Sequence, residues 1–117
     1  MKRLLLVLSV LTLLSTLPLS AEAVDGYLMD TMCSVMMADK GVEGAKKHTK
    51  ACGMAPDCKK SGFGVVTLDS VFLKFDTEGD KKAVELLEGT DKTDNIQVTV
   101  DGEVDGKKIA VKSLTLS

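Results

Sequence analysis

The strongest constraint on the fold is a strict alternation of apolar and polar residues near the C-terminus. From Asn95 to Asp101 every second side chain is apolar, which predicts a strand with one buried face. The dipeptide Asp105-Gly106 then favours a type I′ turn. The stretch 107–117 follows this turn and predicts the returning strand of a hairpin.

The returning strand changes the parity of its apolar positions partway along. Ile109 and Val111 share one parity, whereas Leu114 and Leu116 share the other. Because the side chains of a strand alternate with a period of two, such a change needs an extra residue. We therefore expect a β-bulge or a sharp bend near Lys112-Ser113.

The rest of the chain supplies three more strands and one helix. Turn residues bound the strand candidates, which are 25–30, 62–68 and 71–75. A weak capping box begins at Thr77, and apolar residues at helical spacing then continue to a stop at Gly89. This pattern predicts an amphipathic helix of about ten residues.

The order of these elements predicts a mainly β fold. It runs strand, long insertion, strand, strand, helix, strand, strand. We expect a small five-stranded OB-like Greek-key barrel of antiparallel strands, with a short helix between strands three and four. A helical insertion rich in cysteine and methionine lies between strands one and two. An open α+β sheet with helices on one face is the alternative. We favour the barrel because closure removes most exposed strand edges.

The N-terminus has the pattern of a secretory signal peptide. A basic start precedes a short apolar run, and Ala21-Glu22-Ala23 has the small-x-small pattern of a cleavage site. The apolar run of about 14 residues is shorter than the roughly 20 that span a bilayer. We expect residues 1–23 to be removed and 24–117 to form one periplasmic or secreted domain, with no stable membrane insertion.

The composition argues against nucleic-acid binding. The chain has 15 basic and 17 acidic residues, and only 3% of its residues are aromatic. A protein that neutralises phosphates or stacks on bases needs more positive charge and more aromatic rings. We expect a monomer whose partner is a small ligand, a metal ion or another envelope protein.

The insertion 31–61 concentrates the ligand chemistry of the chain. It holds all three cysteines, the single histidine and four of the six methionines. His48 and Cys52 lie four residues apart, a spacing that places both side chains on one face of a helix. We therefore name His48 and Cys52 as candidate metal ligands.

Copper and zinc are the candidate metals. With Cys33 and Cys58 added, the cysteines and the histidine form a Cys₃His set, which tetrahedral zinc accepts. Additional thioether ligands from Met36, Met37 and Met54 would favour Cu(I), because sulfur donors are soft. Met32, Met36 and Met37 alternatively form an adaptable apolar lid over one end of the barrel, and we favour a core or lid role for the methionines over ligation.

A disulfide is the competing interpretation of the same cysteines, because small exported domains gain stability from one. Cys33 follows the first strand and Cys58 precedes the second, and these strands are neighbours in the expected barrel. We therefore expect a Cys33–Cys58 disulfide, which leaves Cys52 free. The alternative pair, Cys52 with Cys58, closes a much smaller loop.

No catalytic residues can be assigned from the sequence. His48 has no serine nucleophile in a Gly-x-Ser-x-Gly turn, and the chain has no C-x-x-C motif. A thiol redox enzyme would need a reactive cysteine near positive charge, for which Cys52 beside Lys50 and His48 is the candidate. The sequence favours a non-enzymatic role.

Several short motifs resemble those of small exported bacterial proteins with OB-like folds. The motifs are Gly26-Tyr-Leu-Met-Asp30-x-x-Cys33, then His48, Cys52 and Cys58, then Gly62-Phe-Gly-Val-Val, and the ending Val98–Gly102 with Gly106–Val111. In that group the second and third cysteines are often closer together than Cys52 and Cys58 are here. The resemblance covers most of the mature chain and implies an OB-like fold, without implying an activity.

We expect an exported binding or accessory module with a ligand or soft-metal site in 31–61. The alternative is a disulfide-stabilised structural or stress protein of the cell envelope that has no bound cofactor. A thiol redox protein is a more distant alternative.

Overall fold

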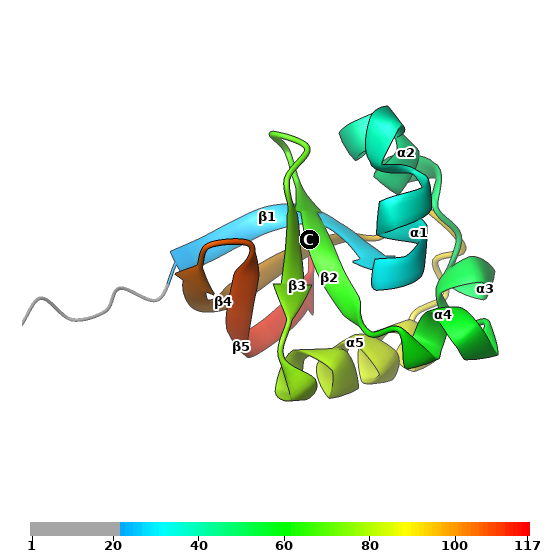
Figure 1. The fold of residues 1–117 in the computed structure, drawn as a ribbon. Helices are drawn as coiled ribbons and strands as arrows, with labels where there is room; N and C mark the ends of the chain where they lie inside the picture. Colours follow the sequence, from blue (N-terminus) through cyan, green and yellow to red (C-terminus); the bar gives the residue numbers. More distant parts are fainter. Residues whose placement is uncertain (1–21) are drawn as a thin grey trace, which may run out of the picture.

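The computed structural model of the protein describes residues 22–117, which form a five-stranded mixed sheet with helices around it (Figure 1). The strands are β1 (Glu22–Asp30), β2 (Phe63–Thr67), β3 (Phe72–Phe75), β4 (Gln97–Asp105) and β5 (Lys108–Leu116). The helices are α1 (Thr31–Met36), α2 (Gly41–Lys47), α3 (Lys50–Gly53), α4 (Pro56–Lys60) and α5 (Thr77–Gly89), with a 3-10 turn η1 (Ala38–Lys40). The predicted order of strands and the helix between strands three and four are confirmed.

The strands pair in the order β1-β2-β3-β5-β4, and β4 pairs back with β1, so the sheet closes on itself. The closure depends on the length of β1, whose first part pairs with β4 and whose second part pairs with β2. Gly26 lies where the two pairings overlap, opposite both Thr67 and Val98. A Cβ atom at this position would collide with the carbonyl group of Val66, so only glycine allows so close an approach.

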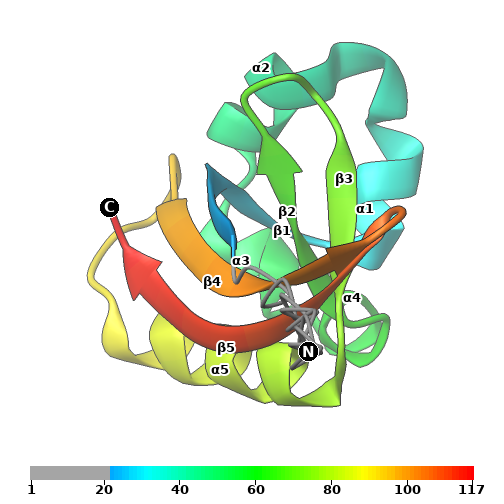
Figure 2. The same ribbon diagram turned by 90° about the vertical axis from the view of Figure 1, so that its left-hand side faces the viewer.

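One pairing corrects the expectation that all strands are antiparallel. Lys74 and Phe75 of β3 pair in parallel with Lys108 and Ile109 of β5, whereas the other four pairings are antiparallel. The chain passes from β3 to β5 through α5 and β4. A long connection of this kind permits a parallel direction, which a tight hairpin cannot give. Figure 2 shows α5 running along β5 at one side of the sheet.

The predicted irregularity in the last strand is confirmed. Asp101 pairs with Ser113, but the next residue, Gly102, pairs with Val111, so Lys112 is the extra residue of a β-bulge. Val111 is therefore buried before the bulge, and the parity of the inward side chains changes after it.

Helix α5 covers one side of the main core with its apolar face, where Ala83 and Leu87 are buried. Its N-cap is Asp76 and not the expected Thr77, because Asp76 Oδ1 accepts the N–H of Gly79 at 3.0 Å. The buried residues of the main core come from all five strands, α5 and the segment before β4: Leu28, Phe63, Val65, Leu73, Phe75, Ala83, Leu87, Ile96, Val98, Val100, Ile109 and Val111.

The insertion between β1 and β2 covers the other face of these strands. Leu28 points into the main core, while Tyr27 and Met29 pack in a second cluster with Ala45 of α2 and Val66 of β2. Strand β1 is thus buried on both faces from Tyr27 onward. This double burial fixes the end of β1 firmly, and the candidate site begins at that end.

The predicted signal peptide, residues 1–23, lies outside the described residues except for its last two. Those two, Glu22 and Ala23, are exposed at the start of β1. Between residues 22 and 117, no helix combines the length and the apolar character needed to cross a bilayer.

Candidate functional site

The candidate site forms where β1 ends and α1 begins. Asp30 is the last residue of β1 and the N-cap of α1, and its Oδ2 accepts the backbone N–H of Cys33 at 2.9 Å. A carboxylate at this position satisfies one of the free N–H groups of the first helical turn. The cap fixes Cys33 beside the carboxylate, which is fully buried.

Helix α4 places Cys58 against α1. Ser61, which follows α4, accepts the N–H of Met32 at 3.1 Å and donates its hydroxyl to the carbonyl of Cys58 at 2.6 Å. The N–H of Thr31 bonds to the carbonyl of Gly62 at 2.9 Å. The bonds of Met32 and Thr31 fasten the start of α1 to the segment after α4, while the Ser61–Cys58 bond closes the end of α4 itself.

A carboxylate oxygen of Asp30 and the Sγ atoms of Cys33 and Cys58 all lie within 4.8 Å of one another. We call these three residues the cysteine cluster. The Sδ atom of Met32 lies at its edge, 4.0 Å from Cys58 Sγ. Both cysteines are half-buried, so the cluster has a buried acidic side and a more accessible sulfur side. Thiolates, carboxylates and thioethers are all protein ligands for transition metals.

His48 closes the buried side of the cluster. Its Nε2 lies 2.8 Å from Asp30 Oδ1, and the two side chains are 5% and 0% exposed. The angles at this contact are not those of a well-directed hydrogen bond, and neither atom has another partner among the described residues. The enclosed space around the two side chains leaves no room for a water molecule. The pair is therefore dry, and each polar atom depends on the other.

The buried carboxylate sets the protonation of the cluster. Burial raises the pKa of Asp30, but the close contact with His48 and the hydrogen bonding from Cys33 outweigh it, so the pKa lies below its ordinary value. Burial, and then the charge of Asp30, raise the pKa of Cys33 to about 12 and also raise the pKa of Cys58. Both thiols are protonated at neutral pH unless a cation binds beside them.

His48 and Cys52 do not share a helix face, which corrects the sequence prediction. Helix α2 ends at Lys47, and His48 and Thr49 are extended before α3 begins. Thr49 caps α3 by accepting the N–H of Cys52 at 3.1 Å. The break turns His48 inward to Asp30 and leaves Cys52 exposed.

The predicted disulfide partners are brought together. Residue Asp30 pairs with Phe63 across β1 and β2, so these strands are neighbours, as the prediction required. All three cysteines are free thiols, with the Sγ atoms of Cys33 and Cys58 within 4.8 Å. A disulfide bond is about 2.05 Å long, so oxidation would require a small movement of α1 and α4. The Cys33–Cys58 disulfide stays a prediction.

The methionines named from the sequence lie away from the cluster contacts. Met36 is 74% exposed, Met37 packs on the second cluster around Tyr27, and Met54 packs on the main core. Sequence reasoning did not name Asp30 as a site residue, and it named Met32 as part of an apolar lid and not beside a cysteine. The Asp30-x-x-Cys33 spacing is that of an N-cap and its N–H partner, and this signal could have identified Asp30.

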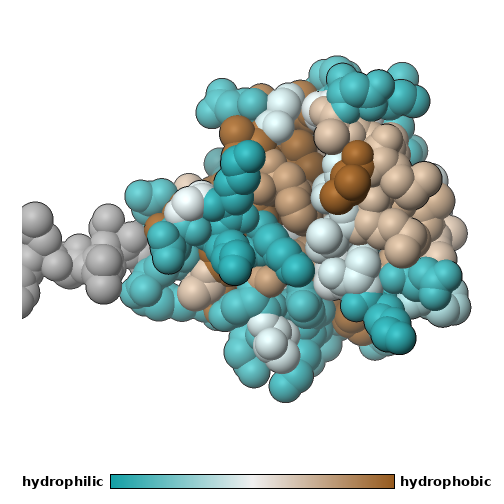
Figure 3. Space-filling view, viewed as in Figure 1, coloured by the Kyte–Doolittle hydropathy of each residue, from teal (hydrophilic) through white to brown (hydrophobic). Residues whose placement is uncertain are grey.

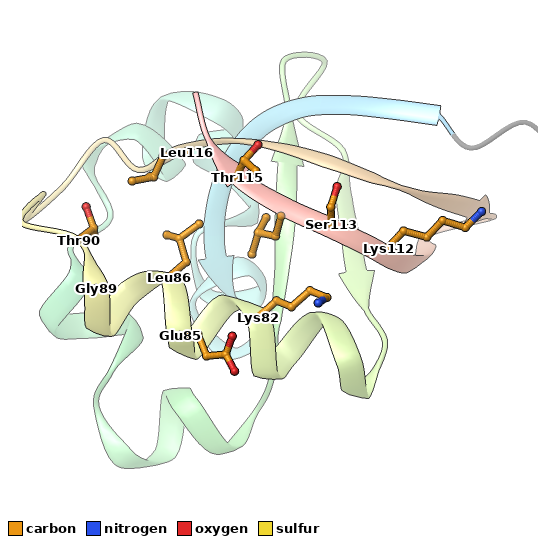
Figure 4. Close-up of a pocket in the computed structure, with 10 residues that line it drawn as sticks. Lys82, Glu85, Leu86, Gly89, Thr90, Lys112, Ser113, Thr115 and Leu116 are labelled. Atoms are coloured by element: carbon orange, nitrogen blue, oxygen red, sulfur yellow. The ribbon is translucent and has the colours of Figure 1, made fainter.

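Two other surface features are separate from the cluster. Figure 3 shows apolar surface over the β2–β3 hairpin and α1, where the exposed large side chains are Val35, Met36, Leu68 and Val71. Figure 4 shows a groove between α5 and β5, with Leu86 and Leu116 on its walls and Lys82 and Lys112 toward one end. Among residues 22–117, the group of potential metal ligands is the cysteine cluster, and neither surface contributes to it.

No known protein family, curated protein or solved structure matches the chain. The functional proposals therefore rest on the residues of the cysteine cluster and on the fold that positions them.

Proposed function

We propose that the protein is an exported binding module that holds a soft transition-metal ion, copper or zinc, at the cysteine cluster. The observation that carries this proposal is the convergence of two thiols and one buried carboxylate within 4.8 Å. The three residues come from three elements, β1, α1 and α4. Asp30 and Cys33 meet through the N-cap of α1, and the tertiary fold brings Cys58 of α4 to them.

The chemistry of the cluster suits a cation. Asp30 carries negative charge in a dry environment, and the pKa values of the two thiols beside it are raised, first by burial and then by that charge. A metal ion would replace one proton on each cysteine that binds it, and would supply the positive charge that a thiolate needs here. The exchange would relieve the repulsion between the carboxylate and the thiolates.

We further propose that the closed sheet is an OB-like Greek-key barrel. The strand order β1-β2-β3-β5-β4, with α5 between β3 and β4, supports this assignment. In OB folds the connection between the first two strands borders the ligand face. Here that connection is the insertion 31–61, which carries the cysteine cluster. The predicted export, to the periplasm or the medium, rests on the N-terminal sequence.

A disulfide-stabilised envelope protein is the second candidate, and the nearness of Cys33 and Cys58 favours it. Metal binding and a disulfide exclude each other at this site, because both use the same two sulfur atoms. A thiol redox enzyme is less well supported. Its nucleophile needs a lowered pKa, whereas burial and the charge of Asp30 raise the pKa values of both cluster cysteines.

Anaerobic titration of the reduced, exported protein with Zn²⁺ and with Cu(I), each against a chromophoric chelator, tests the metal proposal. We expect one ion per chain. Cys33→Ser and Cys58→Ser should each weaken binding at least tenfold, because each removes a ligand. Cys52→Ser is the matched control, since Cys52 is exposed and outside the cluster. Failure to bind either ion, or equal binding by all three variants, would contradict the proposal.

A further inference from the structure

We infer that the ion at this site is Cu(I) and that the Sδ atom of Met32 is its third ligand, beside the thiolates of Cys33 and Cys58. This inference rests on the metal site proposed above, and it assigns to Asp30 a positioning role in place of a ligand role.

The spacing of the sulfur atoms suits three-coordinate binding. Met32 Sδ lies 4.0 Å from Cys58 Sγ, and Cys33 Sγ lies within 4.8 Å of Cys58 Sγ. With metal–sulfur bonds of about 2.3 Å, the length known for zinc, a trigonal ion holds its sulfur ligands about 4 Å apart. Two of the three sulfur separations are thus close to this value, and the third, between Met32 Sδ and Cys33 Sγ, would reach it when the ion binds.

The oxygen and nitrogen donors near the sulfurs are already engaged within the protein. Asp30 Oδ2 accepts the N–H of Cys33, and Asp30 Oδ1 faces His48 Nε2 at 2.8 Å. A metal that recruited either side chain would break the cap of α1 or leave the other member of the dry pair without its contact.

The remaining free donors are soft. Zinc in closed protein sites takes four ligands from thiolate, imidazole and carboxylate groups. Two thiolates and a thioether leave such a site incomplete, whereas Cu(I) accepts a wholly soft set of thiolate and thioether ligands. The donor set at the sulfur side of the cluster therefore favours copper over zinc.

The position of Met32 also gives the ion a route to solvent. Its side chain is 39% exposed, so the thioether lies at the mouth of the site while Cys33 is held by the cap behind it. An ion bound here can be exchanged with thiol or thioether ligands of another molecule. This arrangement suits a module that carries copper more than one that uses a metal to fold.

The test compares Met32→Leu with Met36→Leu in the exported protein under anaerobic conditions. Both substitutions keep an apolar side chain of similar size on α1, and Met36 is 74% exposed with no sulfur contact to the cysteines. We expect Met32→Leu to weaken Cu(I) binding at least tenfold and to leave Zn²⁺ binding unchanged, whereas Met36→Leu changes neither. X-ray absorption of the wild-type copper complex should give three sulfur neighbours, falling to two in Met32→Leu.

The possible results distinguish the Cu(I) assignment from the proposal that a metal binds at the cysteine cluster. If the wild type binds neither ion, the metal site itself is wrong, and the inference falls with it. If the wild type prefers Zn²⁺, or if Met32→Leu binds Cu(I) as tightly as the wild type, the metal site stands and the copper assignment is overturned. Two sulfur neighbours in the wild-type spectrum would exclude Met32 as a ligand.

Discussion

The carboxylate of Asp30 lies 2.8 Å from the imidazole of His48, and both side chains are withdrawn from solvent. This contact joins the end of β1 to the junction between α2 and α3, eighteen positions further along the chain. It therefore holds the insertion against the sheet. Removing one member of a buried pair leaves the other without compensation, which makes the contact a strong determinant of stability.

We predict that Asp30→Asn lowers the free energy of unfolding by about 3 kcal/mol or more at neutral pH. The amide can still cap α1, so most of the loss comes from the contact with His48. Urea denaturation of the reduced protein measures the change. Glu43→Gln is the control, because Glu43 pairs with Lys46 at an exposed position. Exposed ion pairs contribute at most about 1 kcal/mol to the free energy of unfolding. Equal effects of the two substitutions would show that the buried contact does not stabilise the fold.

The same pair predicts how stability depends on pH. Because the pKa of Asp30 is lower in the folded protein than in the unfolded chain, its contribution is complete above the ordinary value of about 3.9. It is lost as the pH falls through the lower, folded value. Stability measured between pH 6 and pH 2 should therefore fall more steeply for the wild type than for Asp30→Asn. Parallel curves would contradict the assigned direction of the pKa.

A third prediction concerns Gly79 in α5. A Cβ atom there would lie 2.6 Å from Val111 Cγ2 and 2.7 Å from Phe75 Cβ, both in the core. We expect Gly79→Ala to destabilise the protein by about 1–3 kcal/mol through overpacking, although alanine is the better helix former. Gly89→Ala, in the same helix with nothing within 4 Å of the added atom, should be neutral or slightly stabilising. Thermal unfolding of both variants measures the difference.

The disulfide prediction applies to the protein under oxidising conditions. We expect an oxidant of the disulfide class, such as oxidised glutathione, to take two electrons and two protons from Cys33 and Cys58 as their sulfurs bond. The closed loop of about 26 residues should stabilise the fold by roughly 3–4 kcal/mol. Non-reducing peptide mapping identifies the pair. A Cys52–Cys58 link with Cys33 free would contradict the placement of α1 beside α4.

The sheet was largely predictable from the sequence because local pattern and final structure agree there. The alternation over 95–101 survives in β4, and the change of parity after Val111 marks the bulge at Lys112. The parallel pairing of Phe75 with Ile109 was not predictable, since it results from the path of α5 and β4 around the core. No local pattern encodes that path.

The candidate site was only partly predictable. Cysteine positions relative to the first two strands pointed to Cys33 and Cys58, which the structure brings together. The prediction that His48 and Cys52 share a helix face was wrong because the helix breaks between α2 and α3. At this break His48 turns to contact Asp30. Helical periodicity describes one helix at a time and cannot reveal a tertiary contact that interrupts it.

Native mass spectrometry of the purified protein after anaerobic Cu(I) loading tests the central claim most directly. We predict a single copper ion on the reduced wild-type chain and on Cys52→Ser, and none on the double variant Cys33→Ser, Cys58→Ser. Circular dichroism of the double variant checks that it remains folded. A wild-type chain that acquires no copper, or a folded double variant that acquires as much as the wild type, would contradict the metal site at the cysteine cluster.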